Sequence, residues 1–146
     1  MLIIEISVPG NTIDHNKKTK IVKYISQALL KVEGLPNTRK SRSLVWCFFN
    51  EIQDGVWSLG GEVNNKLRFF IQIYLFKETL NEKKKKEIVE KVNVTLKGIC
   101  KKEFKENKTL IIINEVPDYN FCTRGKNIGI DELAKYLKIK PESLKN

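Results

Sequence analysis

The sequence Phe49-Asn50-Glu51-Ile52 recurs 64 residues later as Ile113-Asn114-Glu115-Val116. Each copy follows a helix-periodic segment, and Ile21-Val22 in the first segment corresponds to Ile88-Val89 in the second, 67 residues later. The small difference between the two offsets falls in the loop between helix and strand. A single βαβ unit cannot bury its own sheet, so the repeat predicts two such units packed together, or several chains assembled.

Apolar periodicity on either side of the repeat predicts the element order βαββαβ. The expected strands are Leu2 to Val8, Ser43 to Phe49, Leu67 to Phe76 and Thr109 to Ile113. The first expected helix covers about Asn16 to Val32, and the second begins at a Thr79-x-x-Glu82 capping box and continues to Ile99. The fold class is therefore α/β (α+β), with two tandem βαβ units forming a four-stranded sheet that carries both helices on one face.

The chain has 146 residues, which is the usual size of one domain. We expect a single domain over residues 1–130, with repeats at about 1–62 and 67–125. A short helix at Asp131 to Leu137 and a loosely held tail at Lys138 to Asn146 are expected in the C-terminal segment 131–146.

The composition narrows the choice of partners. Lys and Arg total 27 against 17 Asp and Glu, a formal net charge of +10 that can indicate a polyanion partner. Most of the surplus is lysine on expected helix faces, and the run Lys83 to Lys86 points in four directions around a helix. We therefore expect solvated lysines and do not expect nucleic acid as the main partner.

No apolar run is long enough for a membrane span and nothing at the start of the chain is typical of an export signal, so we expect no membrane partner and a cytoplasmic location. The three cysteines are Cys47, Cys100 and Cys122, and the single histidine is His15. This set predicts neither a disulfide framework nor a zinc cluster, and we expect no cofactor and no metal.

Two segments resemble the tautomerase superfamily. Asn50 to Ile52 and then Asp54 to Glu62 resemble its strand-to-turn segment, in which an aromatic residue, here Trp57, precedes a glycine pair beside the active site. Asn114 to Phe121, ending at Gly125, resembles the matching segment of the longer members. The spacing is most similar to the cis-3-chloroacrylic acid dehalogenase-like branch, whose chain is a fused pair of βαβ units.

The resemblance covers about residues 2–125. It implies an isomerase of the tautomerase type that assembles as a homotrimer, binds a small carboxylate ligand and acts through an N-terminal proline. In this sequence Leu2 replaces that proline, and because leucine is too large for the usual removal of methionine, we expect Met1 to remain. The chemistry implied by the family is therefore expected to be weak or absent.

The candidate site residues follow from the same alignment. The α-amine of Met1 is the catalytic candidate, because a buried α-amine can accept a proton or form an imine. Leu2, Trp57 and Lys77 are expected to line the ligand pocket, with Lys77 where the dehalogenases place a substrate-binding arginine. The other matched positions lack the family's functional groups: Leu80 for the second arginine, Leu29 for the activating histidine, and Ile112 and Thr123 for the tyrosine and glutamate that activate water.

Simpler interpretations remain open for each candidate. The Met1 amine and Lys77 could be solvated cations at strand ends, and Trp57 could fill a subunit interface. Glu51 and Glu115 are interpreted as repeat-structural rather than as an acid and base pair. An alternative function is that of a ferredoxin-like nucleic-acid-binding module, in which Phe70, Gln72 and Tyr74 would stack bases, although that strand carries no glycine-aromatic signature.

Overall fold

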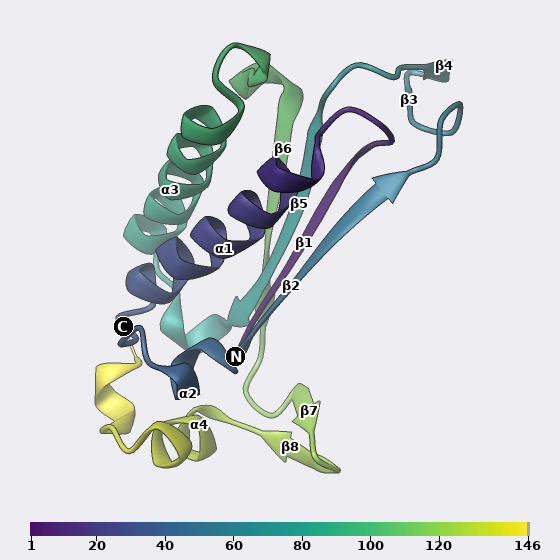
Figure 1. The fold of residues 1–146 in the computed structure, drawn as a ribbon. Helices are drawn as coiled ribbons and strands as arrows, with labels where there is room; N and C mark the ends of the chain where they lie inside the picture. Colours follow the sequence, from purple (N-terminus) through teal and green to yellow (C-terminus); the bar gives the residue numbers. More distant parts are fainter. Residues whose placement is uncertain (146) are drawn as a thin grey trace.

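The protein has two layers, a four-stranded sheet and two long helices that cover one face of it (Figure 1). The computed structural model describes residues 1–145. The strands are β1 (Leu2–Pro9), β2 (Val45–Ile52), β5 (Phe69–Phe76) and β6 (Thr109–Val116), in the order β2-β1-β5-β6. The expected fold class is confirmed.

The pairing of the strands separates this fold from the ferredoxin-like alternative. Within each repeat the two strands are direct neighbours, since β1 pairs with β2 and β5 pairs with β6, both in parallel. The repeats meet where β1 pairs with β5 in the antiparallel direction. A ferredoxin-like sheet has a split βαβ unit, with another strand between the two parallel ones. The sheet that the nucleic-acid alternative requires is therefore not the one observed.

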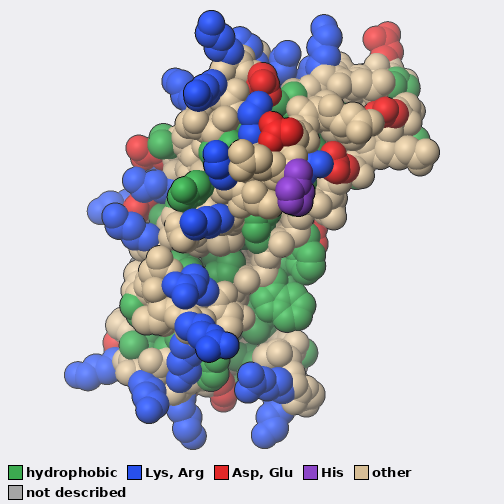
Figure 2. Space-filling view, in the orientation of Figure 1, with side chains coloured by type: hydrophobic (Ala, Val, Ile, Leu, Met, Phe, Trp, Pro, Cys, Tyr) green, Lys and Arg blue, Asp and Glu red, His purple; other side chains and the backbone are tan. Residues whose placement is uncertain are grey.

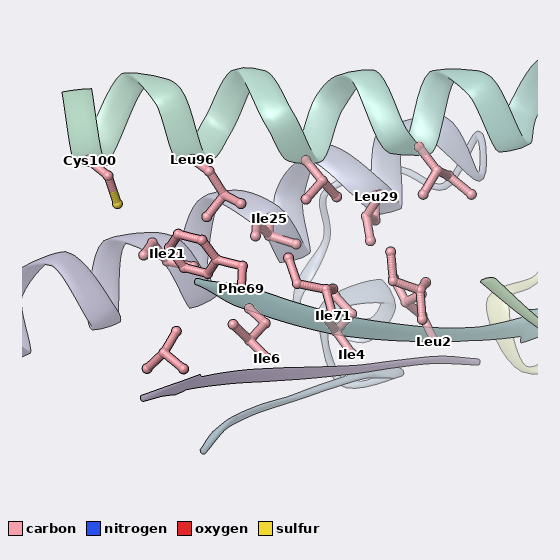
Figure 3. Packing of buried hydrophobic residues seen from close by; sticks show 14 of the residues in the cluster. Leu2, Ile4, Ile6, Ile21, Ile25, Leu29, Phe69, Ile71, Leu96 and Cys100 are labelled. Carbon is pink, nitrogen blue, oxygen red and sulfur yellow. The ribbon is translucent and has the colours of Figure 1, made fainter. Parts of the chain in front are cut away.

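Alternation along the central strands builds the core on the helix-covered face. Every second residue of β1 and β5 is buried and packs against the apolar stripes of α1 (His15–Val32) and α3 (Glu82–Cys100), as Figure 3 shows. Each fully buried Ile or Leu stabilises the fold by about 1.5–3 kcal/mol relative to exposure. The helix-side members include Leu2, Ile4, Ile6, Ile71, Ile73, Ile25, Leu29, Val92 and Leu96.

Both helices begin at a side-chain cap. Asp14 Oδ1 accepts a hydrogen bond from the Lys17 amide, and Asn81 Oδ1 accepts one from the Lys84 amide, both at 2.9 Å. The expected Thr79-x-x-Glu82 capping box is wrong. The Thr79 hydroxyl instead donates to the carbonyl of Phe76 within the 3-10 turn η1 (Lys77–Thr79), and Asn81 takes the capping position.

One ion pair is repeated in both halves. Lys18 Nζ lies 2.6 Å from Glu51 Oε2, and Lys85 pairs with Glu115. These residues match through the same two offsets that relate the repeats, so each pair joins the first turns of a helix to the end of its strand. The repeat-structural interpretation of Glu51 and Glu115 is confirmed.

The expectation that the lysine run is purely solvated needs correction. Lys85 is engaged by Glu115 and Glu82, and Lys84 Nζ donates to the carbonyl of Thr79 at 3.0 Å. Elsewhere on the helix-covered side, Lys and Arg side chains are scattered over the surface rather than gathered at one point (Figure 2).

Several short elements complete the chain. Two hairpins, β3–β4 and β7–β8, follow β2 and β6 at opposite ends of the sheet, and β3–β4 projects from the body (Figure 1). The remaining bounds are β3 (Ser58–Leu59), β4 (Glu62–Val63), β7 (Phe121–Thr123), β8 (Lys126–Ile128), α2 (Arg39–Arg42), α4 (Ile130–Leu137), η2 (Lys101–Glu103), η3 (Glu106–Lys108) and η4 (Pro141–Ser143).

The C-terminal segment is packed against the body, which corrects the expected loosely held tail. Leu144 is 2% exposed and joins a second buried cluster with Leu30, Phe76 and Leu133. Ile139 packs against the same cluster, because α4 ends there and turns its following residues inward. Asn146 lies outside the described residues. Within residues 1–145, no helix combines the length and apolar character needed to cross a membrane.

Candidate active site at the start of the first strand

A cavity of about 340 Å³ opens beside Met1. Met1, the segment leading into β2, the β7–β8 hairpin and α4 all contribute to its lining. The lining side chains are Met1, Ser43, Leu44, Trp46, Thr123, Arg124, Lys126, Ile128, Glu132, Leu133 and Tyr136. Residues from both ends of the chain therefore form one site.

The hairpin over this cavity is held in place by local contacts. The Phe121 ring packs edge-on against Phe76, with ring centroids 4.8 Å apart. Asn127 Nδ2 donates to the carbonyl of Tyr119 at 2.9 Å. At the tip, Arg124 and Gly125 both have positive φ, as a two-residue type I′ turn requires. This turn brings Arg124 and Lys126 into the lining of the cavity.

The α-amine of Met1 differs from an ordinary N-terminal amine. Burial lowers its pKa from 8.0 to about 6, and the nearby Glu33 carboxylate opposes this change only in part. The amine is therefore mainly neutral at pH 7. A neutral primary amine has a free electron pair and can act as a base or as a nucleophile.

Glu33 lies behind the amine. It is the residue that ends α1, it is 9% exposed, and its Oε1 has no hydrogen-bond partner among the described residues. Burial raises the pKa of this carboxyl, while the Thr79 hydroxyl and the charge of Lys84 oppose the change. Glu33 and Met1 share the lining of a crevice of about 10 Å³, which is the space of roughly one water molecule.

The charge of the cavity lining favours an anion. Arg124 and Lys126 supply two cations, and the one acidic side chain in the lining, Glu132, already accepts a hydrogen bond from the Gly129 amide at 3.0 Å. Arginine binds carboxylates with two parallel hydrogen bonds. The site can thus hold a small carboxylate against a neutral amine. No group of three or more His, Cys, Asp or Glu within residues 1–145 is placed to hold a metal ion.

Comparison with known proteins agrees with this architecture. Residues 70–130, which form the second repeat and its hairpin, match the family model described as Tautomerase enzyme. The second repeat is thus similar to the tautomerase family, and the whole chain has the tautomerase-type fold. A search of curated protein sequences finds no significant match.

Solved structures share the fold of this chain over most of its length. One is N1, a member of the cis-3-chloroacrylic acid dehalogenase family, with a TM-score of 0.74 at 18% identity, covering 97% of this chain and 94% of that one. A fused 4-OT solved as an asymmetric trimer gives 0.72 at 18% identity, covering 86% and 94%. Another fused 4-OT, a symmetric trimer, gives 0.70 at 13% identity, covering 91% and 98%. At these identities the likeness shows the fold.

The structure brings together only some of the sequence-predicted site residues. Met1 lines the cavity, and Leu2 lines the crevice behind it while its side chain is buried in the core. Trp57 follows β2 at its far end, and because Leu2 pairs with Val45 at the other end, Trp57 lies roughly 25 Å away along strands rising about 3.3 Å per residue. Lys77 is exposed in η1 and is not part of the cavity lining.

Sequence reasoning missed Glu33, Arg124 and Lys126. Thr123, noted only because it replaces a family glutamate, does line the cavity. The Arg124-Gly125-Lys126 tripeptide could have been recognised in the sequence, because a glycine turn with a cation on each side, next to a family motif, is a candidate anion-binding site. Glu33 carried none, since a glutamate before a helix-ending glycine is ordinarily solvated.

Proposed function

We propose that the protein binds a small carboxylate in the Met1 cavity of a homotrimer, and that the proline-dependent chemistry of its family is weak or absent. The observation that carries this proposal is that Arg124 and Lys126 line the same cavity as Met1, whose buried α-amine has a pKa lowered to about 6. Two cations and an apolar floor suit a ligand with one carboxylate and a short carbon chain.

The free amine of this chain is one residue away from the position that the family chemistry uses. Leu2 donates its backbone N–H to the carbonyl of Leu44 at 3.0 Å and lies in the core, so the free amine belongs to the residue before it. Leu29 and Ile112 have hydrocarbon side chains and neither lines the cavity, so neither supplies a proton-transfer group there. We therefore expect negligible tautomerisation of phenylpyruvate and no dehalogenation of 3-chloroacrylates.

The uncovered sheet face supports the homotrimer. Trp46 and Phe48 on one edge strand and Leu110 and Ile112 on the other are exposed, with Trp46 at 57% and Leu110 at 58%. Apolar surface of this extent needs a covering partner. Further copies of the chain would cover it, and they could also bring a neighbouring Trp57 and Lys77 towards a Met1 cavity, as a pocket shared between subunits requires.

The nucleic-acid alternative has weaker support. Phe70, Gln72 and Tyr74 lie on the open face, whose strand positions within the described chain include no Lys or Arg. The helices α1 and α3, which carry many of the lysines, lie on the other side of the sheet (Figure 1). Stacking groups and phosphate-binding charges would thus face away from each other.

The test is ligand binding measured by calorimetry with pyruvate. We expect binding that weakens tenfold or more in Arg124→Asn and in Lys126→Gln, with Asn chosen because it tolerates the positive φ of position 124. Lys66→Gln is the matched control, since Lys66 is an exposed lysine at the other end of the sheet. Equal affinity in all four proteins would overturn the proposed binding site.

A further inference from the structure

We infer that the α-amine of Met1 forms an imine with 2-oxo acids and that Glu33 carries the proton for this step. The inference rests on the proposed function, because the same cavity must first hold the carboxylate of the oxo acid. It goes further by assigning a covalent reaction to the amine and a role to a buried carboxyl that carboxylate binding does not use.

Met1 stands between two hollows. Met1 lines the cavity of about 340 Å³, together with Arg124 and Lys126, and it also lines the crevice of about 10 Å³, together with Glu33. A 2-oxo acid whose carboxylate is held by the two cations would place its carbonyl carbon deeper in the cavity, towards the amine. The family's proline is a secondary amine, whereas Met1 offers a primary amine, which forms a neutral imine after loss of water.

Glu33 suits the role of proton carrier. It is nearly enclosed, one carboxyl oxygen has no hydrogen-bond partner among the described residues, and it faces the same crevice as the amine. Its other charged neighbour is Lys84, which is held by the carbonyl of Thr79 at 3.0 Å. A carboxyl with a free oxygen in a space for about one water molecule can give a proton to the site and take one back.

The reaction balances without an additional reactant. The electron pair of the Met1 nitrogen attacks the carbonyl carbon, so a C–N bond forms and the C=O double bond becomes a single bond. One proton then passes from the nitrogen to that oxygen, which becomes a hydroxyl. Glu33 donates a proton to the hydroxyl, which leaves as water when the C–O bond breaks. The nitrogen gives its second proton to the Glu33 carboxylate, so Glu33 is restored and a C=N bond and one water are the products.

The experiment traps the imine on the full chain. The protein, with intact Met1 verified by mass spectrometry, is incubated with pyruvate and sodium cyanoborohydride near pH 7, and the adduct is located by peptide mapping. We expect one reduced pyruvate adduct per chain, on the Met1 nitrogen, formed at least tenfold faster than on any lysine. Because this measurement needs no substitution, it stands even if a Glu33 variant fails to fold.

Variants then test Glu33. In Glu33→Gln we expect pyruvate binding within threefold of the unmodified chain but trapping at least tenfold slower, with a changed pH profile and partial recovery in Glu33→Asp. Glu51→Gln is the control, because Glu51 lies at the opposite end of the sheet. Pyruvate binding without an adduct on Met1 overturns the imine alone, no binding overturns the proposed function as well, and unchanged trapping in Glu33→Gln overturns the role of Glu33.

Discussion

At the scale of single residues, burial shifts the pKa values of the Met1 amine and the Glu33 carboxyl in opposite directions. Burial disfavours the charged form of each, so the pKa of the amine falls to about 6 and that of the carboxyl rises. Each group partly offsets the shift of the other, because the opposite charges attract. Two titratable groups that lie close together and are both shifted towards their neutral forms are candidates for proton exchange.

The lowered pKa of the Met1 amine can be tested without any substrate. Competitive labelling with trace acetic anhydride over a pH series should give a titration midpoint for the Met1 α-amine near 6, since only the neutral amine reacts. An ordinary α-amine has a midpoint near 8. A midpoint near 8 in the folded chain would show that the amine is solvated. The urea-unfolded chain is the control and should return to about 8.

The lowered pKa of the Met1 amine also makes the folding stability depend on pH. The folded amine has the lower pKa, so between pH 8 and 6 the unfolded chain binds more protons and folding stability falls as the pH falls. The amine alone would account for a loss of roughly 3 kcal/mol, complete below about pH 6. Glu33 acts in the opposite direction, because its raised pKa lowers stability as the pH rises through that pKa.

At the scale of the elements, regular periodicity made the main helices and strands predictable. The helix expected from about Asn16 is observed from His15, and the last strand extends from Thr109 to Val116, three residues beyond its expected end. Each of those elements buries one face, and the apolar residues of that face recur in the sequence at the period of a helix or a strand. The hairpin over Met1 has no such pattern, because its position depends on Phe121 packing against Phe76, a contact between distant segments.

The position of the C-terminal segment also depends on contacts between distant segments rather than on residue spacing, and it provides a test of stability. Its residues look polar in sequence, yet Leu144 is buried in the cluster beneath the Met1 crevice. Replacing it by Leu144→Ala should lower the free energy of unfolding by about 2–5 kcal/mol, as for other buried leucines. Urea unfolding measures this, with Lys140→Ala as an exposed control. Equal midpoints for both variants would mean that the tail is loosely held after all.

At the scale of the whole molecule, the two faces of the sheet have opposite character. One face is covered by helices that carry lysines outward, and the other presents apolar edges around a polar centre, where Gln72 Nε2 donates to Glu5 Oε2 at 3.3 Å. A polar pair in the middle of an apolar surface fixes how a second surface can be placed on it, because unpaired polar groups are costly once buried. The open face is therefore suited to a specific assembly rather than to loose association.

The last prediction concerns that assembly. Phe48 is 45% exposed and packs edge-on against Trp46, with ring centroids 6.4 Å apart, so it stands at the apolar edge that a neighbouring chain would cover. Sedimentation at micromolar concentration should show a species of three 16.9 kDa chains. Phe48→Glu should convert it to monomers, because a charge buried without a partner costs several kcal/mol at each interface.

Val94→Glu is the matched control for Phe48→Glu. Val94 is also an exposed apolar residue, but it lies on α3, on the helix-covered side, and its substitution should leave the trimer intact. A 16.9 kDa species in the unmodified protein would refute the trimer. Dissociation by Val94→Glu but not by Phe48→Glu would place the interface on the helices instead, and the open face would then need another partner.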